Sequence, residues 1–398
     1  MKSRSAQAVV TPIARSSVAL GAGLVIGACA IVASGNNPAA AYRILFTGAF
    51  GSYEAFANTL RVATPLIFAA LAFSIGLKAG AFNAGIQGQF ALATFATAWI
   101  GVKLSLWQPL LIVILFGAAM ISGLVWATVP IVLRVYFNTN ELIPAFLLNY
   151  VAALLVQYLI VQKFSDPLFN GITNGTPEVK ADAKLPQIMP PYRVTIALLI
   201  IGAGALIALY VYKRMVLGYQ LEMTGKSVRF ARYGGTPTRR VWIGAMATSA
   251  MLAGAAAVPA VAGDQYRAVA GMLPNLMFDG IVVSLMALNN PIAIIPAAMF
   301  LGGLENSGIA LQIDTNIPLD LVTVITGTII LFATAKRVGP VRRVLLWLRG
   351  HIFVDRGPTA TPLGDSVGPE RASVESVSPA ADGEAESLAR MDERGSAG

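Results

Sequence analysis

The feature that most constrains this chain is the regular return of apolar runs, each about as long as a membrane-spanning helix. Such a helix needs about twenty mainly apolar residues to cross a bilayer. The segments of this kind are Ser16–Ser34, Arg61–Leu77, Asn83–Val102, Pro109–Leu133, Glu141–Gln162, Tyr192–Tyr212, Val241–Ala262, Val269–Leu288, Pro291–Gly308 and Leu319–Ala335. Charged residues make up 12% of the chain, against about 25% in soluble proteins. The sequence therefore predicts an all-α, polytopic membrane protein with about ten transmembrane helices.

The composition also excludes several classes of function. A net charge of +9 would suit a nucleic-acid binder, but the basic residues are scattered between apolar runs. We therefore expect a lipid bilayer around the chain and no nucleic-acid partner. The single cysteine, Cys29, and the single histidine, His351, exclude an intramolecular disulfide and a multi-thiolate zinc site. We expect no catalytic residues, no metal site and no cofactor.

One stretch partly imitates a phosphate-binding loop. Gly225, Lys226 and Ser227 fit the end of the motif G-x-x-x-x-G-K-[ST], but the spacing back to Gly218 is too long. No predicted strand precedes the stretch, as that motif requires. If ATP drives the function, its hydrolysis is expected in a separate ATPase subunit.

The distribution of basic residues predicts the orientation of the chain. With both termini in the cytoplasm, most Lys and Arg residues outside the spans fall on cytoplasmic loops. Residues 1–15 then form a cytoplasmic N-terminus and 16–335 the transmembrane domain, with a nearly neutral extracytoplasmic loop at 163–191 and a basic cytoplasmic loop at 213–240. Residues 336–398 form a basic juxtamembrane segment and an acidic cytoplasmic tail, which is predicted to be disordered because it is poor in aromatic residues.

The order of the spans predicts an internal symmetry. Four spans from Arg61 to Gln162 begin outside, and four from Val241 to Ala335 begin inside. This order is typical of inverted repeats, so we expect two inverted four-helix repeats after a first helix. Several spans contain proline, and broken helices at membrane depth are tolerated where the backbone lines a cavity. A path for a solute is therefore predicted.

Side-chain amides are unusually frequent inside two of the predicted spans. In lipid each amide needs a hydrogen-bond partner, so these residues either join helices or line a polar pathway. Both interpretations remain open at this point. The candidates for a pathway surface are Asn83, Gln87, Gln89, Asn149 and Tyr150.

A second polar group lies in the segment 273–280. Asp279 is predicted inside a span, where an unpaired charge costs about 2.5–3.5 kcal/mol and should face a partner or water. Asn275 and Phe278 lie beside it in the sequence. The segment is either a hydrogen-bonded clamp between the repeats or a further part of the pathway.

The predicted loop 213–240 is strongly basic. It contains one acidic residue, Glu222, and seven basic ones: Lys213, Arg214, Lys226, Arg229, Arg232, Arg239 and Arg240. The segment from Ser227 to Tyr233 is predicted to form a short helix that ends at Gly234 and Gly235. The loop is either an anchor on anionic lipid or a docking site for a soluble motor protein.

Taken in order and spacing, these stretches resemble the membrane subunits of bacterial ABC importers for nucleosides and simple sugars, which are related to ribose and branched-chain amino-acid permeases. Residues 82–89 are similar to the family's F-N-I-G-x-E-G-Q, with Gln87 in place of the usual Glu. Residues 140–150 resemble N-E-V-I-x-x-x-x-L-N-Y, 225–236 resemble G-x-N-x-x-A-A-x-Y-x-G-I, and 278–291 resemble the end of G-F-D-G-I-A-V-A-L-x-G-x-x-x-P. The resemblance covers about residues 60–335.

The resemblance implies a multi-pass permease subunit of the bacterial inner membrane, with a fold like that of vitamin B12-type importers. It implies a heterodimer with a sister permease subunit, two ABC ATPase subunits on the inner face and an extracytoplasmic substrate-binding protein. The residues that would contact the ATPase are Glu222, Gly225, Arg229, Ala231, Arg232, Tyr233 and Gly235. The alternative is an ion-gradient-driven secondary transporter of a small polar solute, with Asp279 and Glu305 as coupling carboxylates.

Overall fold

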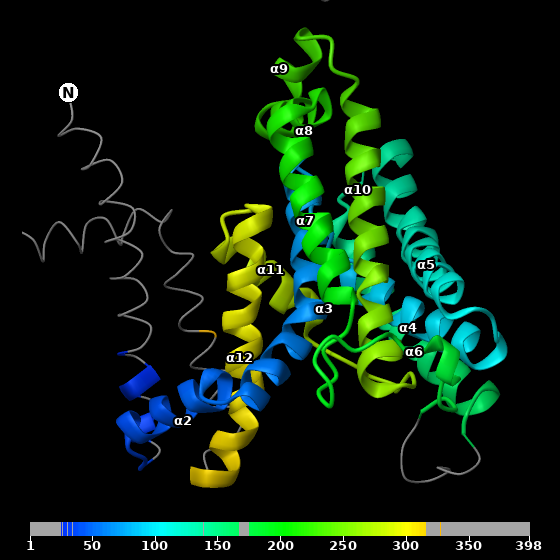
Figure 1. Ribbon diagram of the computed structural model, residues 1–398. Helices are drawn as coiled ribbons and strands as arrows, with labels where there is room; N and C mark the ends of the chain where they lie inside the picture. Colours follow the sequence, from blue (N-terminus) through cyan, green and yellow to red (C-terminus); the bar gives the residue numbers. More distant parts are fainter. Residues whose placement is uncertain are drawn as a thin grey trace, which may run out of the picture. The chain divides into compact units, whose positions relative to one another are not determined.

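The computed structural model describes residues 25, 27–29, 31–33, 35–137, 139–166, 175–315 and 327, and all structural statements below concern these residues. This part of the chain is helical (Figure 1). Its β-structure consists of two isolated bridges, one between Gly175 and Val269 and one between Gln187 and Thr195. The predicted all-α class is therefore confirmed.

The helices follow one another along the chain in this order: α2 Pro38–Phe50, α3 Tyr53–Lys78, α4 Ile86–Lys103, α5 Gln108–Phe137, α6 Leu142–Tyr158, α7 Ala197–Arg214, α8 Val216–Lys226, α9 Val228–Tyr233, α10 Thr238–Ala255, α11 Leu276–Met286 and α12 Pro291–Thr315. Two π-helical turns extend α6 and α10, at Leu159–Lys163 and Pro259–Gln265. A short 3₁₀ turn lies at Ala181–Ala183.

Helices α3 and α10 form the centre of the bundle and run in opposite directions. Arg61, near the start of α3, forms an ion pair with Asp264 in the π-helical turn after α10. At the other end of α3, the ammonium group of Lys78 lies 4.2 Å from the ring of Tyr212, close to where α8 begins. The buried side chains of α3 make up much of the main apolar core. These two helices therefore provide the frame on which the others pack.

The other helices pack on this pair in a symmetric way. α3 contacts α11 and α12, whereas α10 contacts α4 and α5. The contact of α10 with α5 and that of α3 with α12 depend on small residues. A Cβ atom on Gly254 would lie 2.2 Å from the carbonyl oxygen of Ala119, and one on Gly302 would lie 3.0 Å from the backbone nitrogen of Ala63. Small residues let helix backbones approach closely in a membrane. The arrangement matches two inverted repeats, α3–α6 and α10–α12, as far as the described residues reach.

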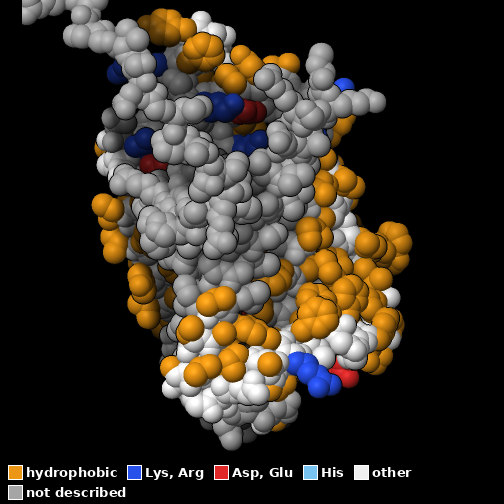
Figure 2. Space-filling view, turned by 90° about the vertical axis from the view of Figure 1, so that its left-hand side faces the viewer, with side chains coloured by type: hydrophobic (Ala, Val, Ile, Leu, Met, Phe, Trp, Pro, Cys, Tyr) orange, Lys and Arg blue, Asp and Glu red, His pale blue; other side chains and the backbone are white. Residues whose placement is uncertain are grey.

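Six of these segments are long and apolar enough to cross a membrane. They are Tyr53–Lys78, Gln108–Phe137, Leu142–Lys163, Ala197–Arg214, Thr238–Gln265 and Pro291–Ile313. On the face in Figure 2, hydrophobic side chains spread over the flanks, and the visible charged side chains gather towards the upper and lower ends of the view. This distribution suits a protein whose middle is surrounded by lipid.

One expected span is wrong in its extent. The segment Val269–Leu288 is helical only from Leu276 to Met286, which is about 16 Å of helix at 1.5 Å per residue. The chain before it turns, because Gly271 and Leu273 have positive φ angles and Pro274 lacks a backbone N–H. α11 therefore begins inside the bundle, and the helix by itself is too short to cross a hydrocarbon core of about 30 Å.

Three helices have no counterpart among the expected spans. Two of them, α2 and α8, were not predicted at all. The third, α9, confirms the short helix that was predicted in the basic loop, with Ser227 as its N-cap. Helix α4 starts at Ile86, three residues later than expected, because 79–85 form a turn. The expected spans Ser16–Ser34 and Leu319–Ala335 lie almost entirely outside the described residues, as do the predicted terminus 1–15 and tail 336–398.

Candidate functional site

Helices α4 and α11 both begin inside the bundle, and their N-termini meet. The side chain of Gln87 donates a hydrogen bond from Nε2 to the carbonyl oxygen of Leu273 at 3.0 Å. Its Oε1 atom accepts one from the backbone N–H of Met277 at 3.2 Å. We call this meeting point, residues 86–88 and 276–278, the junction. Helix N-termini carry free N–H groups and partial positive charge, so the junction favours groups that accept hydrogen bonds.

The turn before α4 is held by a closed set of amide hydrogen bonds. Asn83 donates to Oε1 of Gln89 and to Oγ of Ser249, both at 2.9 Å. Its own Oδ1 accepts from Nε2 of Gln89 at 2.9 Å and from the backbone N–H of Gly85 at 3.1 Å. The side chains of Asn83, Gln89 and Ser249 are fully buried. In this conformation the amides of Asn83 and Gln89 therefore join α4 to α10 and do not line an open surface.

Helix α6 supports the junction through Asn149. Its Oδ1 accepts a hydrogen bond from the backbone N–H of Gly88 at 2.8 Å, and its Nδ2 donates to the carbonyl oxygen of Ala84 at 2.8 Å. One carboxamide thus satisfies a free N–H of the first turn of α4 and a carbonyl of the preceding turn. Of the predicted pathway residues, Asn83, Gln87, Gln89 and Asn149 are brought together.

One residue at this place was missed by the sequence reasoning. The indole nitrogen of Trp126 in α5 would lie 2.7 Å from a Cβ atom placed on Gly88, so only glycine leaves room for it there. This nitrogen is buried without a hydrogen-bond partner among the described residues. A tryptophan in the middle of a predicted span was a signal that could have been used, since a buried indole N–H usually seeks a partner.

The remaining predicted pathway residues lie at the edge of the junction. Phe278 and Tyr150 are exposed, by 56% and 73%. Asn275 is exposed as well, and its carboxamide forms no capping hydrogen bond at the start of α11. Asp279 is half-buried in the first turn of α11. In the described part of the chain, no group of acidic, His and Cys residues could hold a metal ion.

A second candidate surface is formed by α8 and α9. The side chain of Tyr233 is 93% exposed, and Phe230, Arg229 and Arg232 are exposed as well. Ala231 is buried between them and anchors the turn that follows, because its carbonyl oxygen accepts from the backbone N–H of Thr236 at 2.9 Å. We call residues 227–236 the coupling turn. It presents two aromatic rings and two guanidinium groups on one short helix, α9.

Glycines connect this surface with the turn before α4. A Cβ atom on Gly225, in α8, would lie 2.2 Å from the carbonyl oxygen of Lys78 and 3.1 Å from the backbone nitrogen of Gly80. Gly80 itself has a φ angle of +75°, a conformation that favours glycine. The backbones of α8 and of the chain between α3 and α4 therefore touch directly. A displacement of α8 would be transmitted to the chain that carries Asn83.

The electrostatics of α8 are simple. The ammonium group of Lys226 lies 2.6 Å from a carboxylate oxygen of Glu222, one helical turn away. This hydrogen bond, together with the positive charge of Lys226, lowers the pKa of Glu222 below its usual value. Glu222 is therefore ionised at neutral pH, and its charge balances that of Lys226, the one basic residue of α8.

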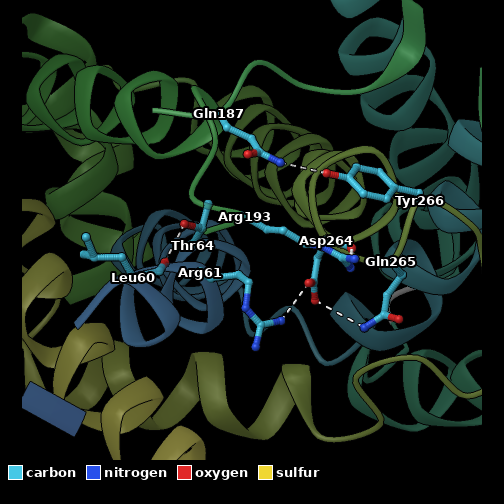
Figure 3. A network of polar contacts seen from close by, with 8 residues as sticks. All are labelled: Leu60, Arg61, Thr64, Gln187, Arg193, Asp264, Gln265 and Tyr266. Carbon is cyan, nitrogen blue, oxygen red and sulfur yellow. Dashed lines mark hydrogen bonds and ion pairs between the residues drawn. The ribbon is translucent and has the colours of Figure 1, made fainter. Parts of the chain in front are cut away.

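The opposite end of the bundle carries a different polar network. Figure 3 shows Arg61 of α3 facing Asp264, and the two side chains lie 2.7 Å apart. Arg193 donates a hydrogen bond to the backbone oxygen of Asp264, and Gln187 donates to the hydroxyl of Tyr266 at 3.1 Å. The predicted loop 163–191 thus contacts the end of α10, apart from residues 167–174, which lie outside the described part.

Backbone hydrogen bonds fix this loop in place. The backbone N–H groups of Thr176, Val179 and Leu185 donate to the segment 262–268 at 2.8–2.9 Å. Outside the spans, Lys184 donates a hydrogen bond to Glu178 at 2.6 Å and lowers the pKa of that carboxyl. The loop and the coupling turn therefore lie at opposite ends of the α3–α10 pair, as the predicted topology requires.

Comparisons with known proteins point to one kind of molecule. A family model described as "Branched-chain amino acid transport system / permease component" matches residues 55–334. The chain is 27% identical over 327 residues to the guanosine ABC transporter permease protein of Bacillus subtilis, covering 80% of this chain and 92% of the relative. It is 30% identical over 323 residues to the glucose ABC transporter permease protein of Haloferax volcanii, covering 78% and 84%. It is 28% identical over 331 residues to the nucleoside ABC transporter permease protein of Lactococcus lactis, covering 80% and 90%.

Proposed function

Because this chain belongs to the permease-component family of branched-chain amino acid transport systems, we propose that it forms the membrane pathway through which an ABC importer moves nucleosides or related simple sugars. The chain is an ABC transporter permease and a multi-pass membrane protein. The family match over residues 55–334 is the observation that carries the proposal. The nature of the solute and the partners are inferred from the relatives and from the geometry.

The junction supports a polar, hydrogen-bonding solute. Two helix N-termini and the amides of Gln87 and Asn149 meet there, and the exposed ring of Phe278 lies at its edge. Hydroxyl groups of a sugar and carbonyl oxygens of a nucleobase accept hydrogen bonds, and a base can stack on an aromatic ring. Two of the three relatives named above carry guanosine or nucleoside in their names, and one carries glucose. We therefore favour nucleosides over sugars.

The coupling turn supports an ATP-driven mechanism. ABC permeases work with ATPase subunits and a substrate-binding protein. We place the ATPase on the coupling turn, where Arg229, Arg232 and Tyr233 are exposed. A movement of α8 reaches the turn before α4 through the contact of Gly225 with Lys78 and Gly80. The pathway side chains of the junction follow that turn directly in the sequence.

The remaining partners follow from this placement. The substrate-binding protein would approach the opposite end, where the 175–195 segment covers the end of α10. The exposed face of Tyr150 would meet a sister permease subunit in a heterodimer. With the coupling turn in the cytoplasm, both termini are cytoplasmic and the protein lies in the bacterial inner membrane.

The decisive experiment measures uptake. The complete transporter, purified through a tag on this chain, is reconstituted into liposomes with ATP on the side of the coupling turn. Radiolabelled guanosine and glucose are offered on the opposite side. We expect concentrative guanosine uptake that requires ATP and the ATPase subunits. The chain reconstituted alone should concentrate neither solute. Concentrative uptake by this chain alone, driven by an ion gradient, would identify a secondary transporter and contradict the proposal.

The docking surface is tested separately. In the double variant R229E/R232E, we expect the ATPase to be lost from the purified complex, because two positive charges on the coupling turn become negative. The control is Arg43→Glu, which makes the same change at an exposed residue of α2. Retention of the ATPase by the double variant would place its docking site elsewhere.

A further inference from the structure

A cavity of about 590 Å³ lies between α7, α8 and α10, apart from the junction and from the coupling turn. Its inner wall reaches Leu71 of α3 and Met120 of α5. Ligand cavities in proteins have volumes of about 300–1,000 Å³. This one lies within the part of the chain that a membrane surrounds, since α7 and α10 belong to two of the spanning segments.

The cavity opens towards the side of α7 that faces away from the bundle. Ile207 of α7 and Leu217 of α8 line it and are exposed by 64% and 54%. The neighbouring side chains Leu206 and Tyr210 of α7 are also exposed. In a bilayer these side chains contact lipid, so lipid has direct access to the cavity.

The walls differ in chemistry from one end to the other. Most of the lining is apolar, whereas Arg240 and Gln220 line the end near the start of α10. The guanidinium of Arg240 is exposed and makes no ion pair with any residue that the structure describes. Arg240 lies in the first turn of α10, where the helix also presents partial positive charge. This end of the cavity therefore favours an anionic group above an apolar chain.

We propose that the cavity is a binding site for an anionic phospholipid, with one acyl chain between α7 and α10 and the phosphate beside Arg240. Basic pockets between transmembrane helices bind anionic head groups, and the charge and the apolar walls here match the two parts of one lipid molecule. The site is independent of the solute and of the ATPase, because it shares no residue with the junction or the coupling turn. It lies beside α8, whose Gly225 contacts the chain before α4.

The test uses a phosphatidylglycerol that carries a photoreactive diazirine in one acyl chain. The complete transporter is reconstituted into phosphatidylcholine vesicles containing this probe and irradiated, and the labelled peptides are identified by mass spectrometry. We expect labelling of α7 and α10 peptides that lie at the cavity. In Arg240→Gln, labelling of these peptides should fall about fivefold, the usual effect of one basic residue near an anionic membrane surface.

A second variant fills the apolar part of the site. A Cβ atom on Gly244 meets no other atom within 4 Å, and Gly244 lines the cavity, so Gly244→Leu should occupy it without disturbing the helix backbone. The matched control is Gly202→Leu on α7, where a Cβ atom also meets nothing within 4 Å but which does not line the cavity. Labelling should be lost in G244L and retained in G202L.

Three results would overturn the proposal. Equal labelling in G244L and G202L would show that the lipid lies elsewhere. Equal labelling by a phosphatidylcholine that carries the same diazirine would show that the site does not prefer an anionic head group, and that the charge of Arg240 has no part in lipid binding. Absence of labelling in the assembled transporter, with labelling of this chain alone, would show that another subunit covers the cavity.

Discussion

The two turns that precede α4 and α11 are alike in sequence but differ in how they are held. Both carry an asparagine five residues before a glycine, Asn83 before Gly88 and Asn275 before Gly280. Asn83 is fully buried and hydrogen-bonded on all sides, whereas Asn275 is exposed and its carboxamide makes no capping hydrogen bond. The glycines lie in the helices that follow and allow close packing there, Gly88 of α4 against Trp126 and Gly280 of α11 against Ala69.

The two asparagines, which lie three residues before α4 and one residue before α11, therefore have separate roles. The first turn is a rigid part of the bundle that contacts α8 through Gly80. The described side-chain hydrogen bonds that hold the second turn and the start of α11 to the first half come from two residues, Gln87 and Asn149. We infer that movement during transport occurs at the second turn, while the first transmits the movement of α8.

The largest effect is expected at Asn83. In Asn83→Ala, the side-chain amide of Gln89 and the backbone N–H of Gly85 lose their hydrogen-bond partners in a buried site. We expect this loss to lower the free energy of unfolding by about 3 kcal/mol. The comparison variant Asn275→Ala, in the second turn, should cost less than about 0.5 kcal/mol, because the Asn275 side chain is exposed. Denaturation followed by tryptophan fluorescence in detergent measures both. Equal losses in the two variants would remove the distinction between the turns.

The next effect is expected at the contact of α8 with the first turn. In Gly225→Ala, the new Cβ atom would lie 2.2 Å from the carbonyl oxygen of Lys78, so α8 must shift away. We expect uptake to fall by about tenfold while the ATPase remains bound, equivalent to about 1.4 kcal/mol of lost coupling. The control Gly202→Ala in α7, where a Cβ atom would meet nothing within 4 Å, should transport normally. Normal uptake by G225A would show that coupling takes another route.

A smaller effect, dependent on pH, is expected at the hydrogen bonds between the turns. Gln87→Glu keeps the acceptor for the N–H of Met277, but an ionised carboxylate cannot donate to the oxygen of Leu273. Protonation restores the donor, so uptake by Q87E should be reduced severalfold at high pH and rise as the pH falls. The wild-type amide does not titrate and serves as the reference. A pH profile of Q87E parallel to that of the wild type would show that these bonds do not hold the second turn.

Much of the fold followed from the sequence because lipid imposes a simple rule. Every backbone polar group in the hydrocarbon region must be satisfied internally, so apolar runs of sufficient length become helices. The spans around α3, α5, α6, α7, α10 and α12 were predicted on this basis, and the basic loop was correctly divided at Ser227 and Gly234. Capping residues and glycines act locally, which makes them visible in the sequence.

The short helix α11 could not be predicted, because composition does not show where a chain turns inside a bundle. Residues 269–288 are apolar enough for a span, yet positive φ angles at Gly271 and Leu273 reverse the chain before the helix begins. The roles of the amides were also ambiguous. Asn83 and Gln87 lie in the same motif, but only tertiary contacts reveal that one is buried against Ser249 and the other joins the two turns.

The smallest effect is expected at the ion pair on α8. Because Lys226 lowers the pKa of Glu222, the pair stabilises the folded chain above the ordinary carboxyl pKa, and this contribution is lost as the pH falls through the lowered value. Both side chains are about half exposed, so solvent screening limits the effect to a few tenths of a kcal/mol. Glu222→Gln should therefore leave uptake nearly unchanged at neutral pH, although it lies in the same helix as Gly225. A loss in E222Q as large as that of G225A would show that charge on α8, and not backbone contact with the first turn, connects the ATPase to the pathway.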